Sequence, residues 1–245
     1  KKFDTLFHFA ANSDISKGVS DYKIELNDTF LTTINSITIC KKLEIKKYIF
    51  SSSSAIFGYI KDKINEFSSP LRPISNYGAM KLSSESYIYS SVNNFDKILV
   101  IRFPNVIGPY MTHGLLYDLG KKINNANKKI KILGNGSQRK PYIYVKNLIY
   151  YIDLLYNKNL KNKINVYNIG PNDNGITVKN IVNLMLKNYN LKKIIPEYEK
   201  KKEGWLGDVT KYSYNNKLIR KTLKISIPST KESILKTIYE NKKLK

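Results

Sequence analysis

The chain has 245 residues, 42% of them hydrophobic, and a formal net charge of +23. This length and apolar content suffice for one large domain, or a domain with an additional lobe, and argue against an intrinsically disordered chain. The single cysteine, Cys40, excludes an internal disulfide framework and is typical of a reducing compartment, so we expect a cytoplasmic protein.

The high charge does not by itself indicate a nucleic-acid-binding protein. Four of the 42 basic residues are arginines, and the 38 lysines are scattered along the chain. Phosphate backbones are bound by clustered cations, so a lysine-coated, solvated surface is the preferred interpretation. We also expect no membrane association, because Asp4 and His8 interrupt the short apolar run at the start and no segment is long enough to span a bilayer.

Strand-like and helical patterns alternate in the first half of the chain. Residues 3–11, 46–54 and 97–106 are apolar runs that predict buried strands, whereas residues 27–43 and 77–91 have helical patterns. This alternation predicts an α/β fold with a parallel sheet covered by helices.

The second half has a more broken pattern, which predicts a smaller lobe. The regular alternation of strand-like and helical patterns ends near residues 108–114. We therefore place a sheet domain at 1–110 and a mainly substrate-binding lobe, with segments returning to the sheet, at 111–245. The predicted elements are a helix near 114–126, strands at 129–133 and 164–170, a helix after Thr177 as N-cap and a final helix near 230–242.

Two predicted strands end in small or polar residues, where open α/β sheets bind their ligands. The first ends in "HFAAN", whose Ala10 and Ala11 allow a ligand to approach the backbone, and the second in "SSSSAIFG", with serines at 51–54. Tight loop packing is the alternative explanation for both.

Tyr77 and Lys81 lie four residues apart, a spacing that places two side chains on one face of a helix. The spacing alone is weak, because the chain contains seven such pairs, where roughly three are expected by chance. What distinguishes this pair is its position 24 residues after the serine cluster, counted from Ser53.

This order of motifs resembles the extended short-chain dehydrogenase/reductase family, and within it the NAD-dependent nucleotide-sugar epimerases and dehydratases, particularly UDP-glucose/UDP-galactose 4-epimerase-like enzymes. The resemblance rests on "HFAAN", "LNDTF", "SSSSAIFG", "YGAMK", "IRFPNVIGPY", "THG", "GNGSQRKPYIYV", "NIG" and "GWLGDV". It implies a Rossmann-like doubly wound parallel sheet that lacks its N-terminal strands here, with a C-terminal substrate-binding lobe.

The resemblance implies that Tyr77 exchanges the proton of a sugar hydroxyl while NAD exchanges the hydride. Lys81 would lower the pKa of Tyr77, since one ammonium at ~6 Å supplies about 3 kcal/mol at an effective dielectric of ~20. Ser53 would polarise the reacting oxygen, with Ser52 or Ser54 selected by a one-residue slip, and Asn27 would brace the adjacent helix.

The resemblance also assigns binding residues for NAD and for a nucleotide-diphosphate sugar. Arg139 and Lys140 would face phosphate, although the family usually has arginine at the second of these positions and an acidic residue at Pro141. Glu203 stands where close relatives have arginine, beside the substrate-binding turn at Asp208. The cofactor set is Ala10, Ala11, Asn27, Tyr77, Lys81 and Pro104, and the substrate set is Ser54, Asn105, Arg139, Lys140 and Asp208.

The sequence contains no glycine-rich G-x-x-G-x-x-G loop to hold the dinucleotide pyrophosphate. We expect that loop, and the residues that would distinguish NAD from NADP, in about 60 preceding residues, because two βαβ steps take ~30 residues each. We expect no metal site, since His8 and His113 lack metal-ligand spacing.

Several alternatives remain open at this stage. A 4,6-dehydratase is the nearest, but Ser54 and Ala55 occupy the positions of that branch's acidic pair, and a reductase or decarboxylase is a further option. An inactive family member that binds RNA or a protein partner is the alternative from another class. The resemblance also implies a homodimer joined through the helices that hold Asn27 and Tyr77.

Overall fold

The structure is a computed structural model that describes residues 2–15, 17–60, 63–126, 128–191, 193–202 and 209–243. Its centre is a four-stranded parallel sheet in the order β1-β2-β3-β8. The strands are β1 (Thr5–His8), β2 (Lys47–Ser53), β3 (Lys97–Phe103) and β8 (Ile164–Asn168).

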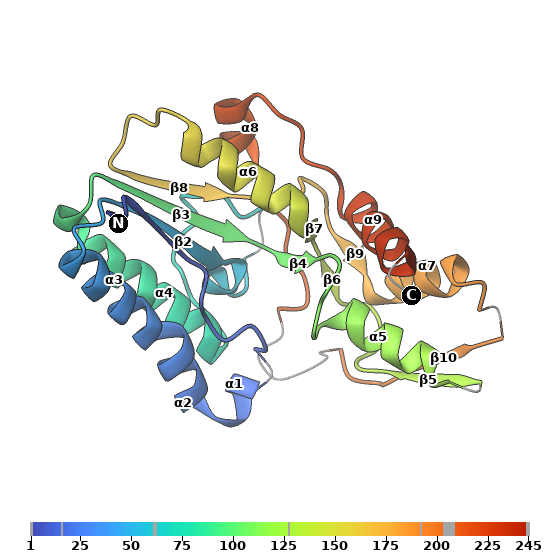
Figure 1. Cartoon of the computed structure of the whole chain (residues 1–245). Coiled ribbons are helices and arrows are strands. Elements are labelled where there is room, and N and C mark those ends of the chain that lie inside the picture. The colour runs from blue at the N-terminus through green and yellow to red at the C-terminus, as the bar shows by residue number, and fades with distance from the viewer. Residues whose placement is uncertain are drawn as a thin grey trace.

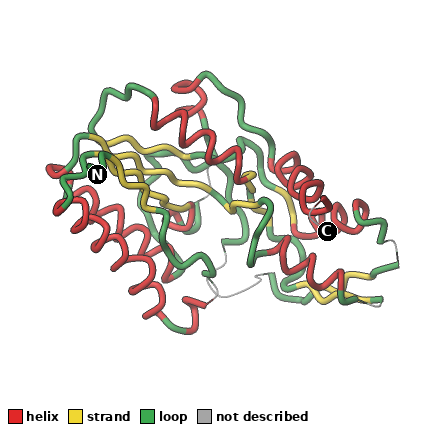
Figure 2. The backbone as a smooth tube through the Cα atoms, viewed as in Figure 1, coloured by secondary structure: helices red, strands yellow, loops and turns green. Residues whose placement is uncertain are grey.

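Helices cover both faces of this sheet, as Figures 1 and 2 show. Side chains that alternate along β2 explain why: Tyr48 and Phe50 join the core under α3 and α4, whereas Ile49 joins the core under α6 and α8. The alternation follows from the two-residue period of a strand, so both faces are apolar. These helices are α3 (Thr32–Lys42), α4 (Asn76–Ser90), α6 (Val145–Asn157) and α8 (Lys217–Leu223).

The segment before α3 is irregular. The predicted helix at 27–43 begins earlier and passes through a six-residue π-helix, η1, which displaces the side chains that follow. The short elements here and after β2 are α1 (Lys17–Ser20), α2 (Tyr22–Glu25), η1 (Leu26–Leu31), η2 (Ser54–Phe57) and η3 (Val92–Asn94).

The predicted strand at 97–106 is divided at Pro104. β3 continues the sheet, whereas β4 leaves it to pair in parallel with β7. Ile107 of β4 and Tyr142 of β7 belong to the lobe's core, and Ile143 belongs to the core of the sheet domain. The β4–β7 pair therefore connects the two cores; its bounds are β4 (Asn105–Ile107) and β7 (Tyr142–Tyr144).

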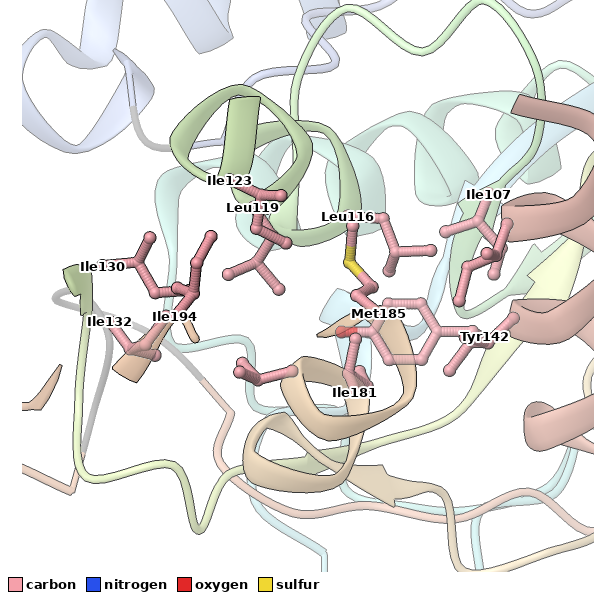
Figure 3. Packing of buried hydrophobic residues seen from close by; sticks show 13 residues of the cluster. Ile107, Leu116, Leu119, Ile123, Ile130, Ile132, Tyr142, Ile181, Met185 and Ile194 are labelled. Atoms are coloured by element: carbon pink, nitrogen blue, oxygen red, sulfur yellow. The ribbon is translucent and has the colours of Figure 1, made fainter. Parts of the chain in front are cut away.

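The lobe has its own hydrophobic core, shown in Figure 3. The N-cap predicted at Thr177 is confirmed, since its side chain accepts a hydrogen bond from Asn180 N at 3.2 Å. The sequence analysis did not predict α6, which covers one face of the sheet, or the β6–β9 pair. The lobe elements are α5 (Leu115–Asn124), β5 (Lys129–Ile132), β6 (Arg139–Lys140), β9 (Ile176–Thr177), α7 (Val178–Asn188), β10 (Ile195–Tyr198) and α9 (Thr230–Lys243).

Candidate active site

Tyr77 lies in the first turn of α4, beside the carboxyl end of β2. The helix begins after Ser75, whose side chain accepts a hydrogen bond from Gly78 N at 3.1 Å. Gly78 allows α4 to approach η2 closely, because a Cβ at this position would lie 2.5 Å from Ala55 O. The serine cap and the glycine together place Tyr77 against the end of the strand.

Ser52, Ser53 and Ser54 at the end of β2 have different partners. Ser53 lies next to Tyr77, where its hydroxyl favours the phenolate form, and accepts a hydrogen bond from Ala55 N at 3.1 Å. Ser52 donates to Glu85, and Ser54 donates to the hydroxyl of Tyr212 at 3.2 Å. The structure therefore brings Ser53 to Tyr77, and the alternation of the strand directs Ser52 away.

Lys81 is buried one turn along α4, with 2% of its surface exposed. Its Nζ donates to Ser51 O at 2.7 Å and lies 4.8 Å from the ring centroid of Phe50 and 5.8 Å from that of Tyr77. Burial lowers the pKa of Lys81 to about 8, against the opposing effect of Glu25 and Glu85.

The predicted lowering of the Tyr77 pKa is not observed. Burial raises the pKa of Tyr77 to about 12, the Ser53 hydrogen bond opposes this rise, and Glu25 adds to it. The Lys81 ammonium lies near the ring and donates to a carbonyl oxygen, so it does not offset the cost of burying a phenolate.

An ion pair beneath the site joins β2, β3 and α4. Arg102 donates from Nε to Glu85 Oε1 at 2.9 Å and from a terminal nitrogen to Oε2 at 2.6 Å. Ser52 and the hydroxyl of Tyr89, at 3.0 Å, donate to the same carboxylate. Because both charges are buried, these bonds fix the strand end relative to the helix that carries Tyr77.

The structure does not place Asn27 in the site. Asn27 is exposed on η1, whereas Thr29, two residues later, is buried. Thr29 donates to Glu25 Oε2 at 2.8 Å and accepts from Asn12 N at 3.2 Å. The sequence analysis did not predict the buried hydrogen-bonded group that Thr29 and Glu25 form here with Asn12.

Another residue that the sequence analysis missed, Tyr212, connects two predicted substrate-binding residues. Its hydroxyl accepts hydrogen bonds from Ser54 Oγ at 3.2 Å and from Asn105 Nδ2 at 3.3 Å. Pro104, predicted to face the cofactor, is buried beside Gly170. Tyr212 follows Ser54 by 158 residues, so no local spacing could have revealed the contact.

The predicted phosphate-binding residues lie in the β6–β9 pair. Arg139 and Lys140 are half-buried in β6, and the Arg139 guanidinium donates to Gly175 O at 3.2 Å. Glu203 and Asp208 lie outside the described residues. Within the described part of the chain, no group of three or more His, Cys, Asp and Glu side chains could hold a metal ion.

The residues at the ends of β1 and β2 fit the nicotinamide-ribose half of a dinucleotide. Ala10 is exposed and Ala11 half-buried, so the backbone after β1 is accessible. The Tyr77 hydroxyl and the Lys81 ammonium lie at the neighbouring strand end and can donate to ribose hydroxyls.

Residues 1–170 match the NAD dependent epimerase/dehydratase family. The chain belongs to this family. The prediction from the motifs is thereby confirmed at the level of NAD-dependent nucleotide-sugar epimerases and dehydratases.

Both dehydratases and epimerases are among the proteins to which the chain is similar. The dTDP-D-glucose 4,6-dehydratase of Dictyostelium discoideum is 26% identical over 201 residues, which cover 76% of this chain and 46% of that protein. The chain thus spans less than half the length of this curated relative.

Solved structures confirm the fold. A UDP-galactose 4-epimerase matches with a TM-score of 0.87 at 24% identity, covering 99% of this chain and 79% of that one. MoeE5 in complex with UDP-glucuronic acid and NAD matches with a TM-score of 0.85 at 20% identity, covering 100% and 81%. The α/β fold with a Rossmann-type parallel sheet is therefore confirmed.

No helix in the described ranges is long and apolar enough to cross a lipid bilayer.

Proposed function

We propose that this family member is an epimerase that inverts a hydroxyl-bearing carbon of a nucleotide-diphosphate sugar of the UDP-glucose/UDP-galactose type. The observation that carries the proposal is the placement of Tyr77 next to Ser53 at the carboxyl edge of the sheet, with the buried Lys81 beside it. A hydroxyl pair at this edge is suited to hold and exchange the proton of a substrate alcohol.

In this mechanism Ser53 donates a hydrogen bond to the substrate oxygen, and Tyr77 exchanges a proton with the substrate hydroxyl group. Bound NAD would supply reversible hydride acceptance at the adjacent carbon. The phenolate form of Tyr77 would accept the alcohol proton as the C–O bond becomes a carbonyl, and the resulting phenol would return it when the carbonyl is reduced from its opposite face. Lys81 favours the phenolate form during the first of these transfers, because its positive charge lies near the ring.

Epimerisation is favoured over dehydration by the residues that follow Ser53. Ser54 and Ala55 occupy the places where the dehydratases of this family carry an acidic pair, and Ser54 is hydrogen-bonded to Tyr212. Neither side chain can act as the additional acid or base that elimination of water requires at neutral pH.

The sugar nucleotide would lie between the sheet edge and the lobe. Asn105, Ser54 and Tyr212 form a connected polar group next to Ser53, suited to hydroxyl groups of the sugar. The half-buried Arg139 and Lys140 would provide positive charge for the diphosphate.

We further propose a homodimer, in a reducing compartment such as the cytoplasm. Several large apolar side chains are exposed along α2, η1 and α3, among them Tyr22 at 63%, Ile39 at 47% and Leu31 at 38%. A second copy placed against this helical face would cover them. Light scattering of the protein, with Ile39→Glu as the disrupting variant, tests the dimer.

The catalytic proposal is tested by following NAD-dependent conversion of UDP-galactose into UDP-glucose. Tyr77→Phe should lower turnover at least about a hundredfold. Tyr117→Phe is the matched control, because Lys121 also follows that tyrosine by four residues and lies 4.6 Å from its ring. Equal activity of the two variants would refute the role of Tyr77, and RNA binding with steep salt dependence in place of turnover would refute the enzyme.

A further inference from the structure

Glu25 is a buried carboxylate that the proposed mechanism does not use. It ends α2, immediately before the π-helix, and has no exposed surface. Asn12 Nδ2 donates to its Oε1 at 2.7 Å and Thr29 Oγ1 to its Oε2 at 2.8 Å. Both donors are uncharged, so they satisfy the oxygen atoms without neutralising the negative charge.

Glu25 lies near the start of the helix that carries Tyr77 and Lys81. Its carboxylate fills the space beside Gly18, where a Cβ would lie 2.3 Å from Oε1. The carbonyl oxygen of Gly18 accepts a hydrogen bond at 2.8 Å from Asn76, the residue before Tyr77. The α2 helix also contacts α4 directly, so the carboxylate is held against this end of α4.

Lys81 is a buried cation, and one carboxylate near it has no positively charged hydrogen-bond partner of its own. Glu85 on α4 is already paired in two hydrogen bonds with Arg102 on β3. Burial lowers the pKa of His8 on β1 to about 4 and raises that of Tyr77 to about 12, so both side chains are neutral at neutral pH. Among these charged and titratable neighbours, Glu25 is the one whose own hydrogen-bond partners carry no charge.

We propose that Glu25 is a positioning residue that acts as the counter-ion of Lys81 and keeps the buried ammonium protonated. The inference deepens the proposed function, because Lys81 would serve Tyr77 as a cation only in its charged form. The electrostatic interactions have the direction that the proposal requires: burial raises the pKa of Glu25 and lowers that of Lys81, and each of the two groups opposes the shift of the other.

The test is a titration of Lys81 by NMR in protein labelled with 13C at the lysine Cε, with the signal assigned by its loss in Lys81→Met. Glu25→Gln keeps the shape of the side chain and removes its charge. The acid dissociation constant of Lys81 should then increase about tenfold or more, since a nearby opposite charge shifts a pKa by about 1–3 units.

Asp28→Asn is the matched control, because it removes an exposed carboxylate from the same π-helix. It should leave the Lys81 titration unchanged within about twofold. A merely structural role for Glu25 predicts the opposite sign, because loosening the site would hydrate Lys81 and raise its pKa toward the ordinary value. An unchanged or raised pKa in Glu25→Gln overturns the proposal.

A reciprocal measurement keeps the inference testable if Glu25→Gln does not fold. Coupling between two proton-binding sites is mutual, so Lys81→Met should raise the pKa of the Glu25 carboxyl group. A Glu25 titration that is the same in wild type and Lys81→Met overturns the proposal. Neither titration involves NAD or sugar turnover, so failure here and failure of the epimerase proposal are distinguishable.

Discussion

His8 should make the stability of this protein depend on pH in the acidic range. The side chain lies at the end of β1, is 4% exposed, and its Nε2 is hydrogen-bonded to Thr33 Oγ1 at 3.0 Å. Its ring stacks on Phe50 with centroids 5.6 Å apart. Burial lowers the pKa of His8 from 6.5 to about 4, and the positive charge of Lys81 adds to this effect.

The sign follows from the protons bound in each state. Between about pH 6.5 and pH 4 the unfolded chain binds a proton at His8 that the folded protein does not, so folding becomes less favourable as the pH falls. The full stabilising contribution of the neutral imidazole is present above the pKa that His8 has in the unfolded chain. A pKa difference of this size corresponds to about 3 kcal/mol lost by pH ~4.

The assay is urea unfolding of wild type and His8→Gln at neutral pH and near pH 4. Burial also raises the pKa of the half-buried Glu66 carboxyl group, so the informative quantity is the difference between the two proteins. The stability of the wild type relative to His8→Gln should fall by about 3 kcal/mol on acidification. A difference that is constant within about 0.5 kcal/mol would refute the reasoning.

Three further predictions concern stability. Arg102→Met should lower the free energy of unfolding by about 3–5 kcal/mol, because Glu85 would remain buried without its partner; adding Glu85→Gln should recover much of this loss in urea unfolding. Gly58→Ala should destabilise by more than about 1 kcal/mol in thermal unfolding, since φ is +62° and the new Cβ would lie 1.9 Å from Arg72 O. Gly120→Ala, in α5 with no neighbour within 4 Å of the new Cβ, should instead stabilise by up to ~1 kcal/mol in the same assay.

The arrangement of Tyr77 and Ser53 could be predicted because it depends on local order. A serine cluster at the end of a parallel strand and a tyrosine at the start of the next long helix necessarily meet at one edge of the sheet. The predicted strand at 97–106 differs from the structure at Pro104, where β3 ends and the chain turns to pair with β7. Proline lacks the amide hydrogen that would continue the ladder.

The remaining site residues depend on features that sequence periodicity does not contain. Residues Leu26–Leu31 form a π-helix in place of the expected regular helix, and within it Thr29 is buried whereas Asn27 is exposed. Tyr212 reaches Ser54 through the tertiary fold. The direction of the Tyr77 pKa was mistaken for a related reason: the charge of Lys81 is visible in the sequence, whereas the extent of burial is not.

The consecutive serines at the end of β2 are not interchangeable. Ser52, Ser53 and Ser54 are chemically identical, yet Ser52 donates to the Glu85 carboxylate, Ser53 accepts from a backbone amide next to Tyr77, and Ser54 donates to Tyr212. Neither neighbour can replace the central hydroxyl, because a one-residue shift of the strand would move Tyr48 and Phe50 into the core that now holds Ile49.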